Sequence, residues 1–77
     1  MSGHYVILVK KPTEKWSAVF GLFNSARGAQ DYINSHCKED YNFSISEATD
    51  EEIDKAIEIR MKNAGSFKGT EFLGRRE

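Results

Sequence analysis

The chain has 77 residues, of which 39% are hydrophobic and 30% are charged. Its 11 basic and 12 acidic side chains leave a formal net charge of −1, which argues against a protein whose main task is to neutralise nucleic-acid phosphates. The single cysteine, Cys37, excludes an internal disulfide, and no apolar run approaches the roughly 18 residues of a membrane span. We therefore expect one soluble, cytoplasmic domain with no membrane partner.

Two apolar segments separated by a short connection begin the chain. Residues 4–11 (HYVILVKK) are rich in β-branched and aromatic side chains, and Pro12 ends this strand because proline has no N–H to donate to a sheet. Residues 16–23 (WSAVFGLF) have the same character, so the two segments predict a β-hairpin. Gly21 inside the second strand indicates a bulge or the close approach of a bulky neighbour.

A helix and a third strand follow the hairpin. Asn24 or Ser25 can cap a helix over residues 25–40, in which apolar residues recur at helical spacing. Residues 41–48 (YNFSISEA) alternate between apolar and polar side chains, which is typical of a half-buried strand at the edge of a sheet.

A second helix is predicted over residues 50–63. Thr49 and Glu52 have the spacing of a capping box, in which each side chain bonds the backbone N–H of the other residue. Gly65 is well placed to end the helix. The expected apolar stripe consists of Ile53, Ala56, Ile57, Met61 and Ala64.

The order of the predicted elements is ββαβα, followed by a C-terminal tail over residues 66–77. A right-handed crossover makes the third strand parallel to the second, and we place it beside the first. The result is a two-layer α+β fold, with a three-stranded antiparallel sheet of order 2-1-3 and both helices on one face. We assign residues 1–65 to a single domain and residues 66–77 to the tail.

Both faces of the predicted hairpin carry large apolar side chains, so the face without helices needs a cover. Lys11 or Lys10 can pair with Trp16, and a slip by one residue exchanges the two faces without changing this conclusion. Either the tail folds over the second face or another protein chain binds there. The residues expected at that interface are Val6, Leu8, Trp16, Val19 and Phe23, joined by Phe67, Phe72 and Leu73 if the tail is free.

Two groups of charged residues are further candidates. Acidic residues at the start of the second helix can complement a basic partner, although acids also favour the positive end of a helix dipole. Lysines around the hairpin turn can bind single-stranded nucleic acid with Trp16, Tyr5 and Phe20 as stacking platforms, although lysines also protect strand ends from edge pairing. The acidic group is Asp50, Glu51, Glu52 and Asp54, and the basic group is Lys10, Lys11 and Lys15.

The sequence contains no motif that indicates catalysis. His36 and Cys37 are adjacent on a helix and point about 100° apart, and His4 is the only other histidine, so a zinc site would need carboxylates to complete it. A glycine-rich phosphate loop and a Ser/His/Asp spacing are both missing. We therefore expect no enzymatic activity, no cofactor and no metal.

The pattern W-x-x-x-F-G-x-F-x-S, followed by Ala29 and Tyr32, resembles small accessory proteins of phages and other mobile elements. The resemblance covers residues 4–36 and includes no active-site signature. It implies a stand-alone module that binds a host protein in the host cytoplasm and redirects or inhibits it, a class that includes anti-defence inhibitors. We predict a small non-enzymatic protein-binding module, for which self-association as a homodimer is also compatible, with weak nucleic-acid binding through the basic turn as the alternative.

Overall fold

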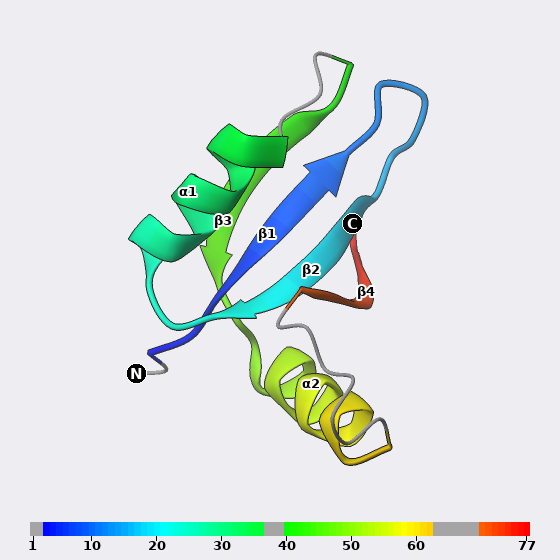
Figure 1. Ribbon diagram of the computed structural model, residues 1–77. Helices are drawn as coiled ribbons and strands as arrows, with labels where there is room; N and C mark the ends of the chain where they lie inside the picture. Colours follow the sequence, from blue (N-terminus) through cyan, green and yellow to red (C-terminus); the bar gives the residue numbers. More distant parts are fainter. Residues whose placement is uncertain (1–2, 37–39, 63–69) are drawn as a thin grey trace.

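The structure is a computed structural model that describes residues 3–36, 40–62 and 70–77. In chain order its elements are β1 (Tyr5–Lys10), β2 (Ser17–Phe23), α1 (Ala26–His36), β3 (Asn42–Glu47), α2 (Asp50–Lys62) and β4 (Glu71–Arg76). The five elements expected from the sequence are present with small changes in their bounds, and β4 is additional (Figure 1).

The hairpin of β1 and β2 has the register that follows from pairing Lys11 with Trp16. Its Cα partners near the turn are Ile7 and Phe20, Leu8 and Val19, and Val9 and Ala18. Residues that face each other in an antiparallel pair share a face of the sheet. One face of the hairpin therefore carries Ile7, Val9, Ala18 and Phe20, and the other carries Leu8 and Val19.

A bulge at Gly21 changes the register at the far end of the hairpin, where Tyr5 pairs with Phe23. A Cβ atom on Gly21 would lie 3.0 Å from Cγ1 of Val6 and 3.3 Å from the carbonyl oxygen of Tyr5. The Val6 side chain and the Tyr5 backbone therefore approach Gly21 more closely than a Cβ atom normally allows, which confirms the prediction made for this position. The bulge also moves Phe23 away from the face on which the sequence placed it.

The expectation of a three-stranded sheet is wrong. The sheet has four antiparallel strands in the order β3-β1-β2-β4. The predicted neighbours β3, β1 and β2 are confirmed, but residues 71–76, expected in the tail, pair with the outer edge of β2. This edge would otherwise leave the backbone groups of a largely apolar strand unpaired, and β4 satisfies them.

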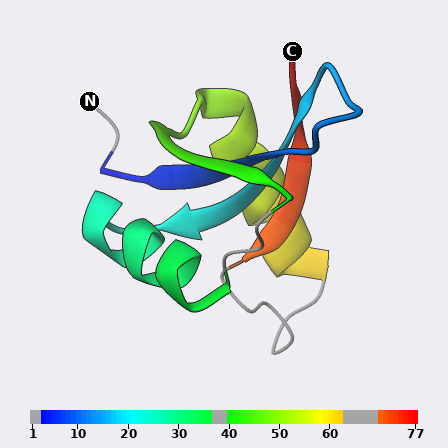
Figure 2. The same ribbon diagram turned by 90° about the horizontal axis from the view of Figure 1, so that it is seen from above.

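The expectation that both helices lie on one face is also wrong, because α1 and α2 cover opposite faces of the sheet (Figure 2). Alternate residues of β1 point to opposite faces, and both sets are mainly apolar, so each face needs a covering layer, which a helix supplies on each side. On the α1 side Ile7 packs with Ala29 and Ile33, together with Val9, Phe23, Tyr32, Phe43 and Ile45. On the α2 side Val6 packs with Val19, Ala48, Ala56 and Leu73, together with Leu8, Leu22, Ile53 and Ile59.

The two helices begin where the sequence indicates, although α2 is rotated relative to the predicted stripe. Ser25 is the cap of α1, since its Oγ accepts a hydrogen bond from the backbone N–H of Gly28 at 3.0 Å. In α2 the sheet side consists of Ala56, Ile53 and Ile59. Ile57 and Met61, both predicted to be buried, are 50% and 77% exposed. The predicted stripe position Ala64 and the helix end at Gly65 lie outside the described residues.

Candidate functional site

The apolar surface predicted from the sequence is largely inside the protein. Val6 and Val19 are fully buried and Leu73 is 5% exposed, because α2 covers the face to which they point. Leu8 packs against the same cluster, and Phe23 lies on the opposite face, where its ring is 5.6 Å from that of Tyr32. Val6, Val19 and Leu73 are therefore buried, Leu8 and Phe23 are half-buried against the two cores, and Phe67 lies outside the described residues.

The two remaining residues of that prediction, Trp16 and Phe72, belong to an open surface on the α1 side. A cavity of about 480 Å³ is lined by Ile7, Val9, Phe20, Tyr32, His36, Tyr41 and Phe43. A second cavity of about 260 Å³, lined by Val9, Lys11, Glu14, Trp16, Ala18, Phe20 and Tyr41, shares three residues with the first. Phe72 is 49% exposed and lies beside Phe20. We call the surface formed by Trp16, Phe20, Tyr32, Tyr41, Phe43 and Phe72 the aromatic face.

Contacts between neighbouring rings fix the aromatic face. Phe20 and Phe72, which are Cα partners on β2 and β4, meet edge to face with their ring centroids 5.7 Å apart. Tyr32 and His36, one turn apart on α1, stack with a centroid distance of 4.1 Å and an interplanar angle of 17°. A ring nitrogen of His36 also lies 3.0 Å from the backbone oxygen of Tyr32. A partner would therefore meet rings whose orientation is largely set before binding.

Two cations lie over rings of this face. Cζ of Arg75 is 4.3 Å from the ring centroid of Trp16, and Nζ of Lys11 is 5.7 Å from that of Tyr41. Both distances are within the range of cation–π attraction. The carboxylate residue Glu14 lines the same cavity as Lys11 and Trp16. The rim of the aromatic face thus combines positive and negative groups, with the cations next to the rings.

The structure separates the three lysines that the sequence grouped. Lys11 lines the cavity at Trp16, and Lys15 is exposed in the turn beside it. Lys10 follows Val9 on β1, and strand alternation directs it to the α2 side. The second cation next to the aromatic rings is instead Arg75, which lies over Trp16. Sequence reasoning missed Arg75 because its position depends on the pairing of β4 with β2, which the predicted tail did not include.

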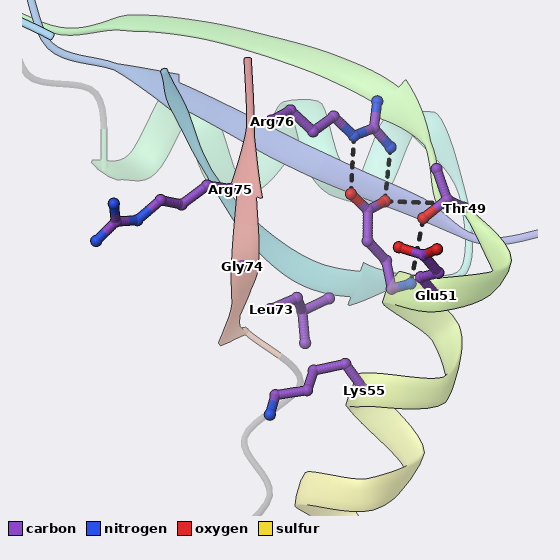
Figure 3. Close-up of a pocket in the computed structure, with 8 residues that line it drawn as sticks. Thr49, Glu51, Lys55, Leu73, Gly74, Arg75 and Arg76 are labelled. Atoms are coloured by element: carbon purple, nitrogen blue, oxygen red, sulfur yellow. Dashed lines mark hydrogen bonds and ion pairs between the residues drawn. The ribbon is translucent and has the colours of Figure 1, made fainter. Parts of the chain in front are cut away.

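A third cavity, of about 550 Å³, lies between the start of α2 and β4 (Figure 3). Its polar centre is the ion pair of Glu52 and Arg76: Nε and Nη2 of Arg76 donate to the two carboxylate oxygens at 2.8 and 2.6 Å. Arg76 also donates to Oγ of Ser46 at 2.8 Å and to the backbone oxygen of Glu47 at 2.9 Å. We call this arrangement the clasp, since it joins β4, the start of α2 and β3.

Glu52 completes the clasp through the predicted capping box. Its carboxylate accepts from the backbone N–H of Thr49 at 2.9 Å, and its own N–H donates to Oγ1 of Thr49 at 3.2 Å. Burial acts to raise the pKa of Glu52, but the hydrogen bonds from Arg76 and Thr49 and the charge of Arg76 together hold it below its ordinary value. The same pair raises the pKa of Arg76. Both side chains are therefore charged, and each also hydrogen-bonds a residue outside the pair.

This arrangement corrects one predicted role. Glu52 was grouped with the acidic residues expected to face a partner, but it is only 7% exposed. Asp50, Glu51 and Asp54 are exposed and remain accessible. The sequence does distinguish Glu52 from these three acidic residues, because the capping-box spacing directs its side chain back toward Thr49.

In residues 3–36, 40–62 and 70–77, no group of three or more His, Cys, Asp or Glu side chains could hold a metal ion, and no buried side-chain nitrogen or oxygen lacks a hydrogen-bond partner. Neither α1 nor α2 is long and apolar enough to cross a membrane. Comparison with protein-family models, with curated proteins and with solved structures finds no match for the chain.

Proposed function

We propose that this protein is a non-enzymatic binding module that holds a segment of another protein on the aromatic face. The observation that carries the proposal is a difference between the two parts of the sheet that no described helix covers. On the α2 side, β3 presents the polar residues Asn42, Ser44 and Ser46. On the α1 side, β2 and β4 present Phe20 and Phe72. Rings in an uncovered position are typical of an interface.

The composition of the face indicates what it would bind. Tryptophan, tyrosine, phenylalanine and arginine are enriched at the centres of protein interfaces, where they contribute most of the binding energy. The cavities beside Phe20 can take a bulky apolar side chain. Lys11, which lines one of them, and Arg75, which lies over Trp16, favour a neighbouring carboxylate. We therefore expect the partner segment to combine an aromatic or branched apolar residue with Asp or Glu.

Single-stranded nucleic acid is the second candidate, and one observation favours it. Lys11 and Arg75 lie over Tyr41 and Trp16, which places positive charge beside rings on which a base could stack. Glu14 in the same cavity and the net charge of −1 oppose this function, because a phosphate backbone would be repelled by both. The protein partner therefore has the stronger support.

A selection of random peptides on the immobilised protein tests the proposal. The expected result is a set of peptides that share a bulky apolar residue next to Asp or Glu and that quench or shift the fluorescence of Trp16. Binding should be lost in the variant Phe72→Ser and retained in the control Met61→Ser, which alters a side chain 77% exposed on α2. Circular dichroism establishes that both variants are folded.

Three outcomes would contradict the proposal. The first is a selection that yields no shared pattern, and the second is binding that Phe72→Ser leaves unchanged. The third is binding of an oligothymidylate, weakened by salt and by Phe72→Ser, in the absence of peptide binding, which would establish the second candidate instead. That the natural partner is a host protein, and that binding inhibits it, stays a prediction from the sequence resemblance.

A further inference from the structure

The two edges of the sheet differ in their protection against pairing with another chain. The outer strand β4 contains Arg75 and Arg76, and Gly74 has a φ of 134°, which interrupts the regular strand. Charged side chains and local irregularity are common means of blocking an edge. The other outer strand, β3, has the sequence NFSISE, which contains no Lys, Arg, Pro or Gly and has its one charged residue, Glu47, at the end. No described strand pairs with its outer side, where the backbone oxygen of Glu47, at the end of β3, accepts a hydrogen bond from Arg76 and residues 42–46 are left for pairing.

We propose that β3 pairs with the β3 strand of a second copy of this chain, antiparallel and about a twofold axis at Ser44. The two sheets would then join into one sheet of eight strands, and the interface would be the same on both copies. This register opposes Ser44 to Ser44, Phe43 to Ile45, and Asn42 to Ser46 of the other copy. Because opposed residues share a face, apolar side chains meet on the α1 side and polar side chains meet on the α2 side.

Other registers of the same pairing fit less well. An axis at Ile45 would oppose Phe43 to Glu47, which places a carboxylate against an apolar ring. An axis between two residues would bring Phe43 and Ile45 to the polar face of the other copy, since a shift by one residue reverses every side chain. An axis at Phe43 would pair only three residues of β3 on each copy, against five with the axis at Ser44.

The position of α1 is compatible with this joining. α1 lies over β1 and β3, so the helices of two copies would be separated by about two strand spacings, or roughly 10 Å, which is close to the distance at which helices pack. Tyr32 faces β2, where it contacts Phe23, and helical spacing therefore directs Gln30 and Asn34 toward the β3 edge. These two exposed side chains are uncharged and bond each other at 3.0 Å. They present no repulsion to a second α1.

Opposite charges at position 44 provide the test. In Ser44→Lys or Ser44→Glu, two like charges would face each other at the axis, and each variant should raise the dissociation constant of the dimer at least about tenfold. An equimolar mixture of the two variants should recover a dimer that contains one chain of each. Ser35→Lys, on an exposed position of α1, is the matched control and should dimerise like the wild type. Native mass spectrometry and sedimentation equilibrium distinguish one chain of 8.8 kDa from two.

The pairing through β3 would be overturned by a wild-type protein that stays monomeric at millimolar concentration. It would also be overturned if both Ser44 variants remained dimeric, or if their mixture gave no mixed dimer. A dimer that is abolished by Phe72→Ser but not by the Ser44 variants would place self-association on the aromatic face instead. Ser44 is exposed, so the variants should fold, and circular dichroism checks this. The result does not depend on whether the aromatic face binds a peptide.

Discussion

The clasp should supply a large share of the stability of this small domain. Arg76→Met removes four hydrogen bonds, two of them to the carboxylate of Glu52, and leaves that carboxylate buried without its cation. Loss of one partner from a buried ion pair costs about 3–5 kcal/mol. The side chain of Arg76 is 26% exposed, which weakens the pair through solvent screening, so we expect about 2–3 kcal/mol. For a domain of this size the melting temperature should fall by roughly 10–20 °C.

The pH dependence of stability gives an independent measurement of the same clasp. The pKa of Glu52 is lower in the folded protein than its ordinary value of 4.5, so the charged carboxylate stabilises the fold. This contribution is complete above about pH 4.5 and is lost as the pH falls through the lower pKa of the folded state. Urea unfolding between pH 2 and pH 7 should therefore show a decline for the wild type that is reduced in Glu52→Gln.

A double-mutant cycle isolates the coupling between the two residues. The free energies of unfolding of Glu52→Gln, Arg76→Met and the double variant should not add, because each single change already removes the charge pair. Glu58→Gln is the control, since it breaks an exposed pair with Lys62 at 3.1 Å and should leave the melting temperature unchanged. Additive effects, or an Arg76→Met variant as stable as this control, would refute the reasoning.

Three further predictions concern the core and the aromatic face. Gly21→Ala forces a Cβ against Val6 and should destabilise the protein by about 1–3 kcal/mol in urea unfolding, whereas Gly3→Ala, which meets no atom within 4 Å, should have no effect. Val6→Ala should cost about 2 kcal/mol because the side chain is completely buried, and Ile57→Ala, at a half-exposed position, should cost less than about 0.5 kcal/mol; equal losses would contradict the placement of α2. Arg75→Gln should change the emission of Trp16, the single tryptophan, and lower stability by about 0.5–1 kcal/mol; unchanged emission would mean that the two side chains do not stack in solution.

The local features of the fold could be predicted from the sequence because each depends on residues close together in the chain. The hairpin, the glycine bulge, the cap at Ser25 and the capping box of Thr49 and Glu52 are of this kind. The strand β4 is different. Its sequence EFLGRR is short, contains Gly74 and alternates only weakly, so nothing within it indicates a strand. What makes it a strand is the open edge of β2, some fifty residues earlier in the chain.

The sequence also does not determine which face of the sheet each helix covers, and the reason is similar. Helical spacing shows that α2 has an apolar side but not which face of the sheet that side meets, and two β-strands that are apolar on both faces accept a helix on either. The missing strand β4 also affected the prediction of the binding residues. Arg75 and Arg76 are neighbours in the sequence, but they point to opposite sides of β4, so that one lies over Trp16 and the other bonds Glu52 (Figure 3).

The dimensions of the elements explain why α1 and α2 each leave part of a face of the sheet uncovered. α1 has 11 residues and is therefore about 16 Å long, and a helix is about 10 Å wide, whereas four strands span roughly 19 Å. One helix can thus cover about half of a face. On the α2 side the half that α2 leaves uncovered carries the exposed polar residues Asn42 and Ser44, together with Ser46, which bonds Arg76. The fold gives no comparable reason for Phe20 and Phe72 on the open half of the α1 side, because polar residues would serve there equally well. These two rings are therefore the reason that we propose a bound partner on this face.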